Sequence, residues 1–165
     1  YQKIFEEIGV KKTYSLPITE RSDAQNPEYV KILEKSTGIF VTGGNQLRLS
    51  TILGGTPIAK TIRQLNALGV NYAGTSAGAA IVSQHMITGG STGTVPTQGG
   101  VNLAPGMGLI NTIVVDQHFN ERNRLARLLS AVSYNPFLIG VGLDEDTAAF
   151  IDHNNIFTVV GKGAI

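Results

Sequence analysis

A serine between two glycines stands where the chain passes from an apolar segment into a run of small residues. The pentapeptide GTSAG (residues 74–78) follows the apolar segment 70–73 and opens into a stretch that predicts a helix. A G-x-S-x-G between a strand and a helix is the pattern of a nucleophile elbow. The serine of such an elbow lies on a sharp, strained turn, where a Cβ at either glycine would crowd the neighbouring strand or helix. The pattern predicts Ser76 as a nucleophile, with helix-start N–H groups beside it that can stabilise an oxyanion.

A serine needs a general base to attack at neutral pH, and the chain has three histidines,. His85 is predicted in the helix after the elbow, about two and a half turns from Ser76, and should point away from it. His153 is predicted in a hairpin turn, exposed to solvent. His118 follows a predicted strand directly and is the best candidate for the base. A histidine at a strand end can equally well cap a backbone group.

A catalytic triad also needs a carboxylate that orients the histidine. Asp144, Glu145 and Asp146 follow the predicted strand 137–142, and any one of them could do this. The alternative is a solvated acidic turn. The chain order serine, histidine, acid differs from that of α/β-hydrolases, but triads are defined by geometry rather than by order.

Three arginines follow His118 on a predicted helix over residues 121–132. Arg124 and Arg127 are three positions apart and share a helix face, and Arg122 lies slightly off it,. Because guanidinium pairs with carboxylate in a bidentate way, the cluster indicates recognition of carboxylates. The alternative is an ordinary solvated helix face.

Composition limits the class of protein. The 165 residues suit one domain with a core, and the formal net charge of +1 gives no sign of a nucleic-acid partner,. No cysteine is present, which excludes disulfides, a thiolate zinc site and a cysteine nucleophile,. No metal-ligand spacing, phosphate-binding loop or membrane-spanning apolar run is found.

Strand and helix patterns alternate along the chain, which predicts an α/β fold with a mostly parallel sheet covered by helices on both faces. Ligands bind such sheets at the carboxyl ends of the strands, where the polar clusters described above are predicted to meet. The Gly- and Thr-rich segment 88–108 is predicted to be a long loop or lid. Helices are predicted at 1–8, 27–34, 46–53, 57–68, 77–86 and 121–132, and strands at 12–18, 38–42, 70–73, 112–115, 137–142, 148–151 and 156–160.

Four segments together resemble the cyanophycinases far more specifically than the elbow does alone. They are TGIFVTGGNQLRL (37–49), AGTSAGAA (73–80), VVDQHFNERNRLARLL (114–129) and GLDEDTA (142–148). The similarity runs over about residues 1–163, in the family's order and close to its spacings. Cyanophycinases are serine peptidases that cleave cyanophycin, a poly-aspartate chain with arginine on each β-carboxyl, into β-Asp-Arg dipeptides.

The resemblance implies a role for each candidate residue. Ser76 would be the nucleophile, His118 its base and Glu145 the orienting acid. The backbone N–H groups of Gly44 and Ala77 would form the oxyanion hole. The residues implied to hold the substrate are Gln46, Asp116, Gln117, Arg122, Arg124 and Arg127.

The resemblance also implies a fold like that of class I glutamine amidotransferases and of aspartyl dipeptidase, a flavodoxin-like three-layer sandwich. We expect residues 1–165 to form a single α/β peptidase domain that is incomplete at both ends. No cofactor or metal is implied, and no nucleic acid or membrane partner. A cytoplasmic homodimer is expected, with secretion left open. The alternatives are an aspartyl or isoaspartyl dipeptidase of the same fold, and a non-catalytic binding module, which would be expected to lack Ser76 or His118.

Overall fold

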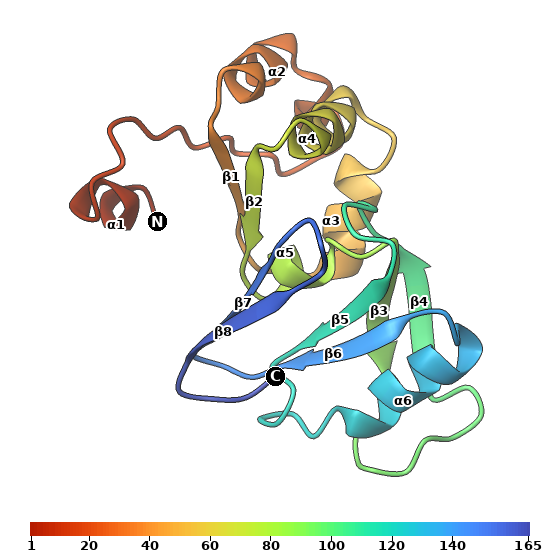
Figure 1. Ribbon diagram of the computed structural model, residues 1–165. Helices are drawn as coiled ribbons and strands as arrows, with labels where there is room; N and C mark the ends of the chain where they lie inside the picture. Colours follow the sequence, from red (N-terminus) through yellow and green to blue (C-terminus); the bar gives the residue numbers. More distant parts are fainter.

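Two pairs of parallel strands and two antiparallel hairpins make up the strand framework of the computed structural model, which describes residues 1–165. Figure 1 shows one parallel pair in the upper half of the molecule and the other in the lower half. The parallel pairs are β1 (Gly38–Val41) with β2 (Asn71–Gly74) and β5 (Ile113–Gln117) with β6 (Ile139–Leu143). The antiparallel pairs are β3 (His85–Gly90) with β4 (Val101–Pro105) and β7 (Thr147–Ile151) with β8 (Phe157–Gly161).

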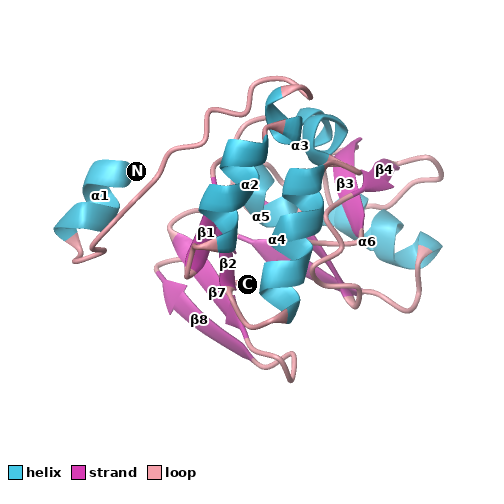
Figure 2. Ribbon diagram, turned by 90° about the horizontal axis from the view of Figure 1, so that it is seen from above, coloured by secondary structure: helices cyan, strands magenta, loops and turns pink.

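Six helices and one 3-10 turn pack around these strands. Helix α5 lies between the two parallel pairs, against β1, β2 and β5, and α6 packs on β6 (Figure 1). Figure 2 shows α1 set apart from the other helices, at the end of a long loop, and α1 buries none of its residues. The helices are α1 (Gln2–Glu7), α2 (Pro27–Glu34), α3 (Gln46–Leu53), α4 (Pro57–Ala67), α5 (Ala77–Ala80) and α6 (Leu125–Tyr134), and the 3-10 turn is η1 (Asp23–Gln25).

Side-chain caps explain why three helices begin where the sequence predicts. The Asn26 side chain accepts the N–H of Glu28, and the Asn45 side chain accepts the N–H of Arg48. Thr56 caps α4 in the same way, and a proline occupies the first turn of both α2 and α4. Each capping side chain accepts an N–H group that would otherwise lack a partner at the helix start, and proline there has no N–H group that needs one. The predictions for 27–34, 46–53 and 57–68 are confirmed to within one residue.

The core has two main parts. The larger cluster joins α4, α5 and β1 and includes Ile58, Ile62, Ile81 and Met86. A second cluster joins β3, β5 and α6 around Val114. Because α5 and β3 contribute to these clusters, the segment that follows Ser76 is held by buried apolar packing,.

The prediction of one helix over 77–86 is wrong after Ala80. Ser83 instead forms an isolated β-bridge with Ile110, and its hydroxyl accepts the N–H of Val115. His85 then begins β3, which pairs with β4 and buries Met86. Tertiary pairing therefore overrides a weak local helix signal. The predicted structureless loop 88–108 is correspondingly wrong in part, since it contains the end of β3 and all of β4.

Helix α6 begins at Leu125, four residues later than predicted. His118 and Asn123 both adopt positive φ, at 51° and 48°, and α-helical residues cannot,. The chain makes tight turns instead, in which the N–H of Arg122 donates to the carbonyl of His118. The predicted strand 12–18 is also wrong, because Pro17 interrupts it and no partner strand pairs with it,. The hairpin around residues 152–155 is confirmed.

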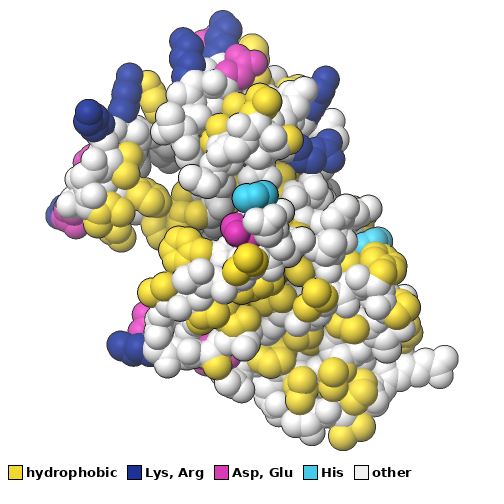
Figure 3. Space-filling view, viewed as in Figure 1, with side chains coloured by type: hydrophobic (Ala, Val, Ile, Leu, Met, Phe, Trp, Pro, Cys, Tyr) yellow, Lys and Arg dark blue, Asp and Glu magenta, His cyan; other side chains and the backbone are white.

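The α/β class is confirmed, but the strand pairs are evenly divided between parallel and antiparallel, so the expectation of a mostly parallel sheet holds only for β1–β2 and β5–β6. Hydrophobic side chains gather on the lower half of the face seen in Figure 3. Among the exposed apolar side chains are Phe137, Ile139, Phe150 and Val160, from the β6 region and from the β7–β8 hairpin. None of the helices combines the length and apolar character that a membrane span requires.

Candidate active site

The elbow places Ser76 in a backbone conformation that few residues adopt. Its φ is 53° and its ψ is −116°, at the N-terminal end of α5. A Cβ on Gly74 would collide with the carbonyl of Gly78, and a Cβ on Gly78 would collide with the carbonyl of Val41. The two glycines therefore let the turn pack directly against the end of β1, and this packing holds the strained serine.

A chain of hydrogen bonds links Ser76, His118 and Glu145. Ser76 Oγ lies 3.0 Å from His118 Nε2, and His118 Nδ1 lies 2.6 Å from Glu145 Oε1. These contacts fit a neutral imidazole whose Nδ1–H donates to the carboxylate while Nε2 accepts from the serine hydroxyl. His85, in contrast, packs edge-on against the ring of Phe137. Of the three histidines, His118 is the one that contacts Ser76.

Only one of the three clustered acids contacts the histidine. Asp144 accepts hydrogen bonds from Asn120 and from the backbone N–H of Ala164. Asp146 forms an exposed ion pair with Lys162 at 3.1 Å. Of the three, Glu145 is the acid that contacts His118. The sequence left open which acid orients the histidine, and the contacts of the three now distinguish them.

Two further side chains, which the sequence patterns did not indicate, support this arrangement. Glu121 accepts the backbone N–H of Glu145 at 3.0 Å. The Tyr72 hydroxyl donates to the carbonyl of Gly78 at 2.8 Å, and burial raises the pKa of Tyr72 well above its usual value,. Tyr72 thereby holds the first turn of α5. No short-range sequence signal marks either contact, because both depend on how separate segments meet.

Two backbone N–H groups in segments next to the serine have no protein acceptor. Ala77 is the first residue of α5, and Gly44 follows β1 with a φ of +138°. Neither N–H donates to any backbone or side-chain acceptor. Gly43, next to Gly44, approaches so closely that a Cβ there would lie 3.0 Å from Ser76 Cβ. Donors at these positions can serve a negative oxygen that develops next to Ser76 Oγ.

Two of the three arginines that the sequence grouped for carboxylate recognition, Arg124 and Arg127, are buried. Arg127 makes a bidentate pair with Asp116, with Nε 2.6 Å from Oδ2 and Nη2 2.5 Å from Oδ1, and Arg124 lies 3.4 Å from Oδ1. These three residues are at most 8% exposed. They pack together because Asp116 is on the buried strand β5, and a buried carboxylate requires a partner. Burial, and then the charge of Arg127, lowers the pKa of Arg124,.

The remaining predicted substrate residues lie in different settings. Arg122 is exposed and makes no ion pair, whereas Gln117 is buried and accepts from Arg124 Nη1 at 3.2 Å. Gln46 is half-buried, and its side-chain amide donates to the carbonyl of Ile87 at 2.9 Å. Gln117 thus joins the Asp116 cluster to the site, and Gln46 is attached to β3.

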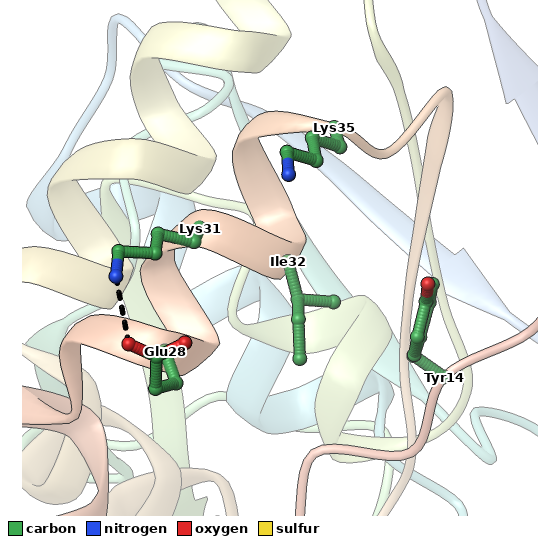
Figure 4. Close-up of a pocket in the computed structure, with 5 residues that line it drawn as sticks. All are labelled: Tyr14, Glu28, Lys31, Ile32 and Lys35. Carbon is green, nitrogen blue, oxygen red and sulfur yellow. Dashed lines mark hydrogen bonds and ion pairs between the residues drawn. The ribbon is translucent and has the colours of Figure 1, made fainter.

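A pocket of about 240 Å³ adjoins the hydrogen-bonded chain. A second pocket, of about 170 Å³, lies at the surface of α2 (Figure 4), where Lys31 pairs with Glu28 at 2.7 Å and Tyr14 faces Ile32. No group of three or more His, Cys, Asp or Glu residues is arranged to hold a metal ion. The larger pocket is lined by Gly74, Thr75, Ser76, Ala79, Gln117, His118, Leu143, Asp144, Glu145, Asp146 and Thr147.

Comparison with known proteins gives relatives over the whole chain. A cyanophycinase from Geminocystis herdmanii is 46% identical over 166 residues, which is all of this chain and 61% of that protein. A cyanophycinase from a Nostoc species is 45% identical over all of this chain, which corresponds to 56% of that protein. The chain therefore spans about three fifths of the length of these relatives.

Solved peptidase structures also match nearly the whole chain. A peptidase from an acI-B1 actinobacterium superposes with a TM-score of 0.74 at 27% identity, over 98% of this chain and 64% of the other. A putative peptidase E protein from Listeria monocytogenes shares the fold, with a TM-score of 0.61 at 23% identity over 98% of this chain and 75% of the other. The model of peptidase family S51 matches residues 1–159. Because that match takes in nearly the entire sequence, including Ser76, His118 and Glu145, the chain belongs to peptidase family S51.

Proposed function

We propose that this protein is a serine peptidase that hydrolyses cyanophycin to β-Asp-Arg dipeptides through an acyl-enzyme on Ser76. The observation that carries the proposal is the hydrogen-bonded chain Ser76–His118–Glu145, with distances of 3.0 and 2.6 Å. Such a chain on a strained turn is the arrangement that activates a serine hydroxyl. The substrate is inferred from relatives at 45–46% identity that are named cyanophycinases.

The reaction follows from these contacts. Ser76 Oγ attacks a backbone carbonyl of the substrate while His118 Nε2 takes the hydroxyl proton. The N–H groups of Gly44 and Ala77 bind the oxyanion of the tetrahedral intermediate. His118 then gives its proton to the leaving amine, and a water molecule, activated in turn by His118, releases the acyl group. Glu145 holds the imidazole in the required tautomer and stabilises its charged form.

Charge supports a substrate that carries carboxylates. In the buried Asp116 cluster two guanidinium groups share one carboxylate, which leaves the cluster with a net positive charge. Gln117 connects this cluster to the pocket beside Ser76. A substrate carboxylate bound near Gln117 would balance the charge. The resemblance implied that Asp116 holds the substrate, but its carboxylate is already paired with Arg127 inside the protein.

One observation favours the alternative, a dipeptidase that acts on aspartyl or isoaspartyl dipeptides. The pocket of about 240 Å³ is small and suits a single dipeptide,. Of the three arginines implied to hold the substrate, only Arg122 is exposed, and a small dipeptide needs a less extended basic surface than a polymer does. A non-catalytic binding module is less well supported, because Ser76 and His118 are both present and in contact.

We also infer a single α/β peptidase domain of the class I glutamine amidotransferase-like, flavodoxin-like type. The likeness to other peptidase structures supports this fold. The family resemblance further implies a homodimer in the cytoplasm, and both properties stay predictions.

The proposed function is tested by incubating the purified protein with cyanophycin, and separately with small aspartyl dipeptides. We expect β-Asp-Arg to be released from cyanophycin by the parent and not by Ser76→Ala, because the alanine has no nucleophilic oxygen. Dipeptides are detected by mass spectrometry. Cleavage of the small dipeptides alone would establish the alternative, and equal release by Ser76→Ala would reject both.

Replacing Glu145 with glutamine should lower kcat by about a thousandfold or more, because the amide no longer stabilises the correct imidazole tautomer or its charged form. Glu34→Gln removes the same charge from an exposed position on α2 and serves as the control. Rates on cyanophycin and thermal unfolding are measured for both variants. Parent-like turnover by a folded Glu145→Gln variant would contradict the assigned role.

Removing the exposed guanidinium of Arg122 should weaken substrate binding without harming the fold. We expect Arg122→Ala to raise KM for cyanophycin about fivefold, the size of one surface ion pair, while hydrolysis of a neutral ester is unchanged. Arg63→Ala, an exposed change on α4, is the matched control. Equal losses on both substrates would argue that Arg122 does not recognise the polymer.

A further inference from the structure

We propose that Asp144 is a positioning residue that holds Glu145 against His118 by clamping together the segments that follow three strands. The inference rests on the proposed function, since it concerns how the Ser76–His118–Glu145 chain is held. In this role Asp144 supports Glu145 and does not replace it as the acid that contacts His118.

Asp144 is the meeting point of three separate segments. Its Oδ1 accepts the backbone N–H of Asn120 at 3.1 Å, and its Oδ2 accepts the Asn120 side-chain amide at 3.0 Å. Oδ2 also accepts the backbone N–H of Ala164 at 3.0 Å, and the Asp144 N–H donates to the Ala164 carbonyl at 3.3 Å. One carboxylate thus joins the segment after β5, its own segment after β6, and the segment after β8.

Glu145 needs such support because its own side chain is poorly confined. It is 54% exposed, and the contact with His118 is its single side-chain hydrogen bond. An exposed glutamate loses rotamer freedom when it is held in one position, so the backbone that carries it must be fixed by other contacts.

Two neighbouring contacts supply that fixation. Asn120 bonds to Asp144, and the adjacent Glu121 accepts the N–H of Glu145 at 3.0 Å. Because His118 precedes Asn120 by two residues, these two contacts set the distance between the imidazole and the Glu145 carboxylate. The side chain of Asp144 remains charged in this role. The N–H groups of Ala164 and then Asn120 hold its pKa below the usual range, against the opposing effect of burial,.

Asparagine at position 144 cannot replace this clamp. An amide offers one oxygen, and its NH₂ group would face the N–H donors of Asn120 or Ala164. A displacement of about 1 Å between catalytic groups can cost about a hundredfold in rate. We therefore expect Asp144→Asn to slow activation of Ser76 by about 10- to 100-fold.

The experiment measures the rate at which Ser76 is labelled by a fluorophosphonate reagent. In this reaction the serine oxygen bonds to phosphorus, the hydroxyl proton passes to His118 and fluoride leaves. This rate reports the reactivity of Ser76 and does not depend on binding of the peptide substrate. Asp144→Asn and Asn120→Ala, which opens the clamp from its other side, should both slow labelling. Asp152→Asn is the matched control, because Asp152 likewise accepts two backbone N–H groups, from Asn154 and Ile156, in the remote β7–β8 turn.

A double-mutant cycle separates positioning from general stability. If Asp144 acts through Glu145, Asp144→Asn should cost little more in a protein that already carries Glu145→Gln. Unchanged labelling in folded Asp144→Asn and Asn120→Ala would overturn the inference alone, and so would a fully additive loss in the cycle. A parent protein whose Ser76 is not labelled would overturn the proposed function and the inference with it.

Discussion

The tight approach of the elbow to the end of β1 is the constraint on which the rest of the site depends. Gly78 leaves no room for a side chain beside the carbonyl of Val41, and Gly74 leaves none beside the carbonyl of Gly78. This contact keeps Ser76 at a φ of 53°, so that its hydroxyl points toward His118 while the N–H of Ala77 stays free. A relaxed backbone would lose both at once, because the serine oxygen and the N–H donor belong to adjacent residues.

Strain recurs at the ends of the other strands that build the site. His118 and Asp146 also have positive φ, at 51° in each case, and they flank the contacts between the segments after β5 and β6. Positive φ in residues other than glycine is costly and persists only where surrounding contacts enforce it. Here the enforcing contacts are polar, from Asn120 to Asp144 and from Glu145 to Glu121. The buried pairing of Asp116 on β5 with Arg127 on α6 anchors the adjoining end of β5.

Features fixed by neighbouring residues could be predicted from the sequence, and features fixed by distant contacts could not. The caps at Asn26 and Thr56 act within one helical turn, so α2 and α4 were predictable, as was the glycine-flanked elbow. The end of α5 is decided by a bridge between Ser83 and Ile110, which no local pattern reveals. Pairing of Arg127 with Asp116, likewise, depends on β5 being buried. The residues alone left the choice among Asp144, Glu145 and Asp146 open, because the contacts of Asp144 with Asn120 and Ala164 join segments that are far apart in the sequence.

The central claim is that the chemistry passes through a covalent intermediate on Ser76. The most direct measurement is to mix the protein with a short cyanophycin fragment, stop the reaction with acid during turnover, digest the protein and weigh its peptides. The account predicts that the peptide containing Ser76 gains the mass of the substrate's acyl group, and that the gain disappears once substrate is exhausted. Active protein that shows no such adduct, or an adduct on a different residue, would contradict the account.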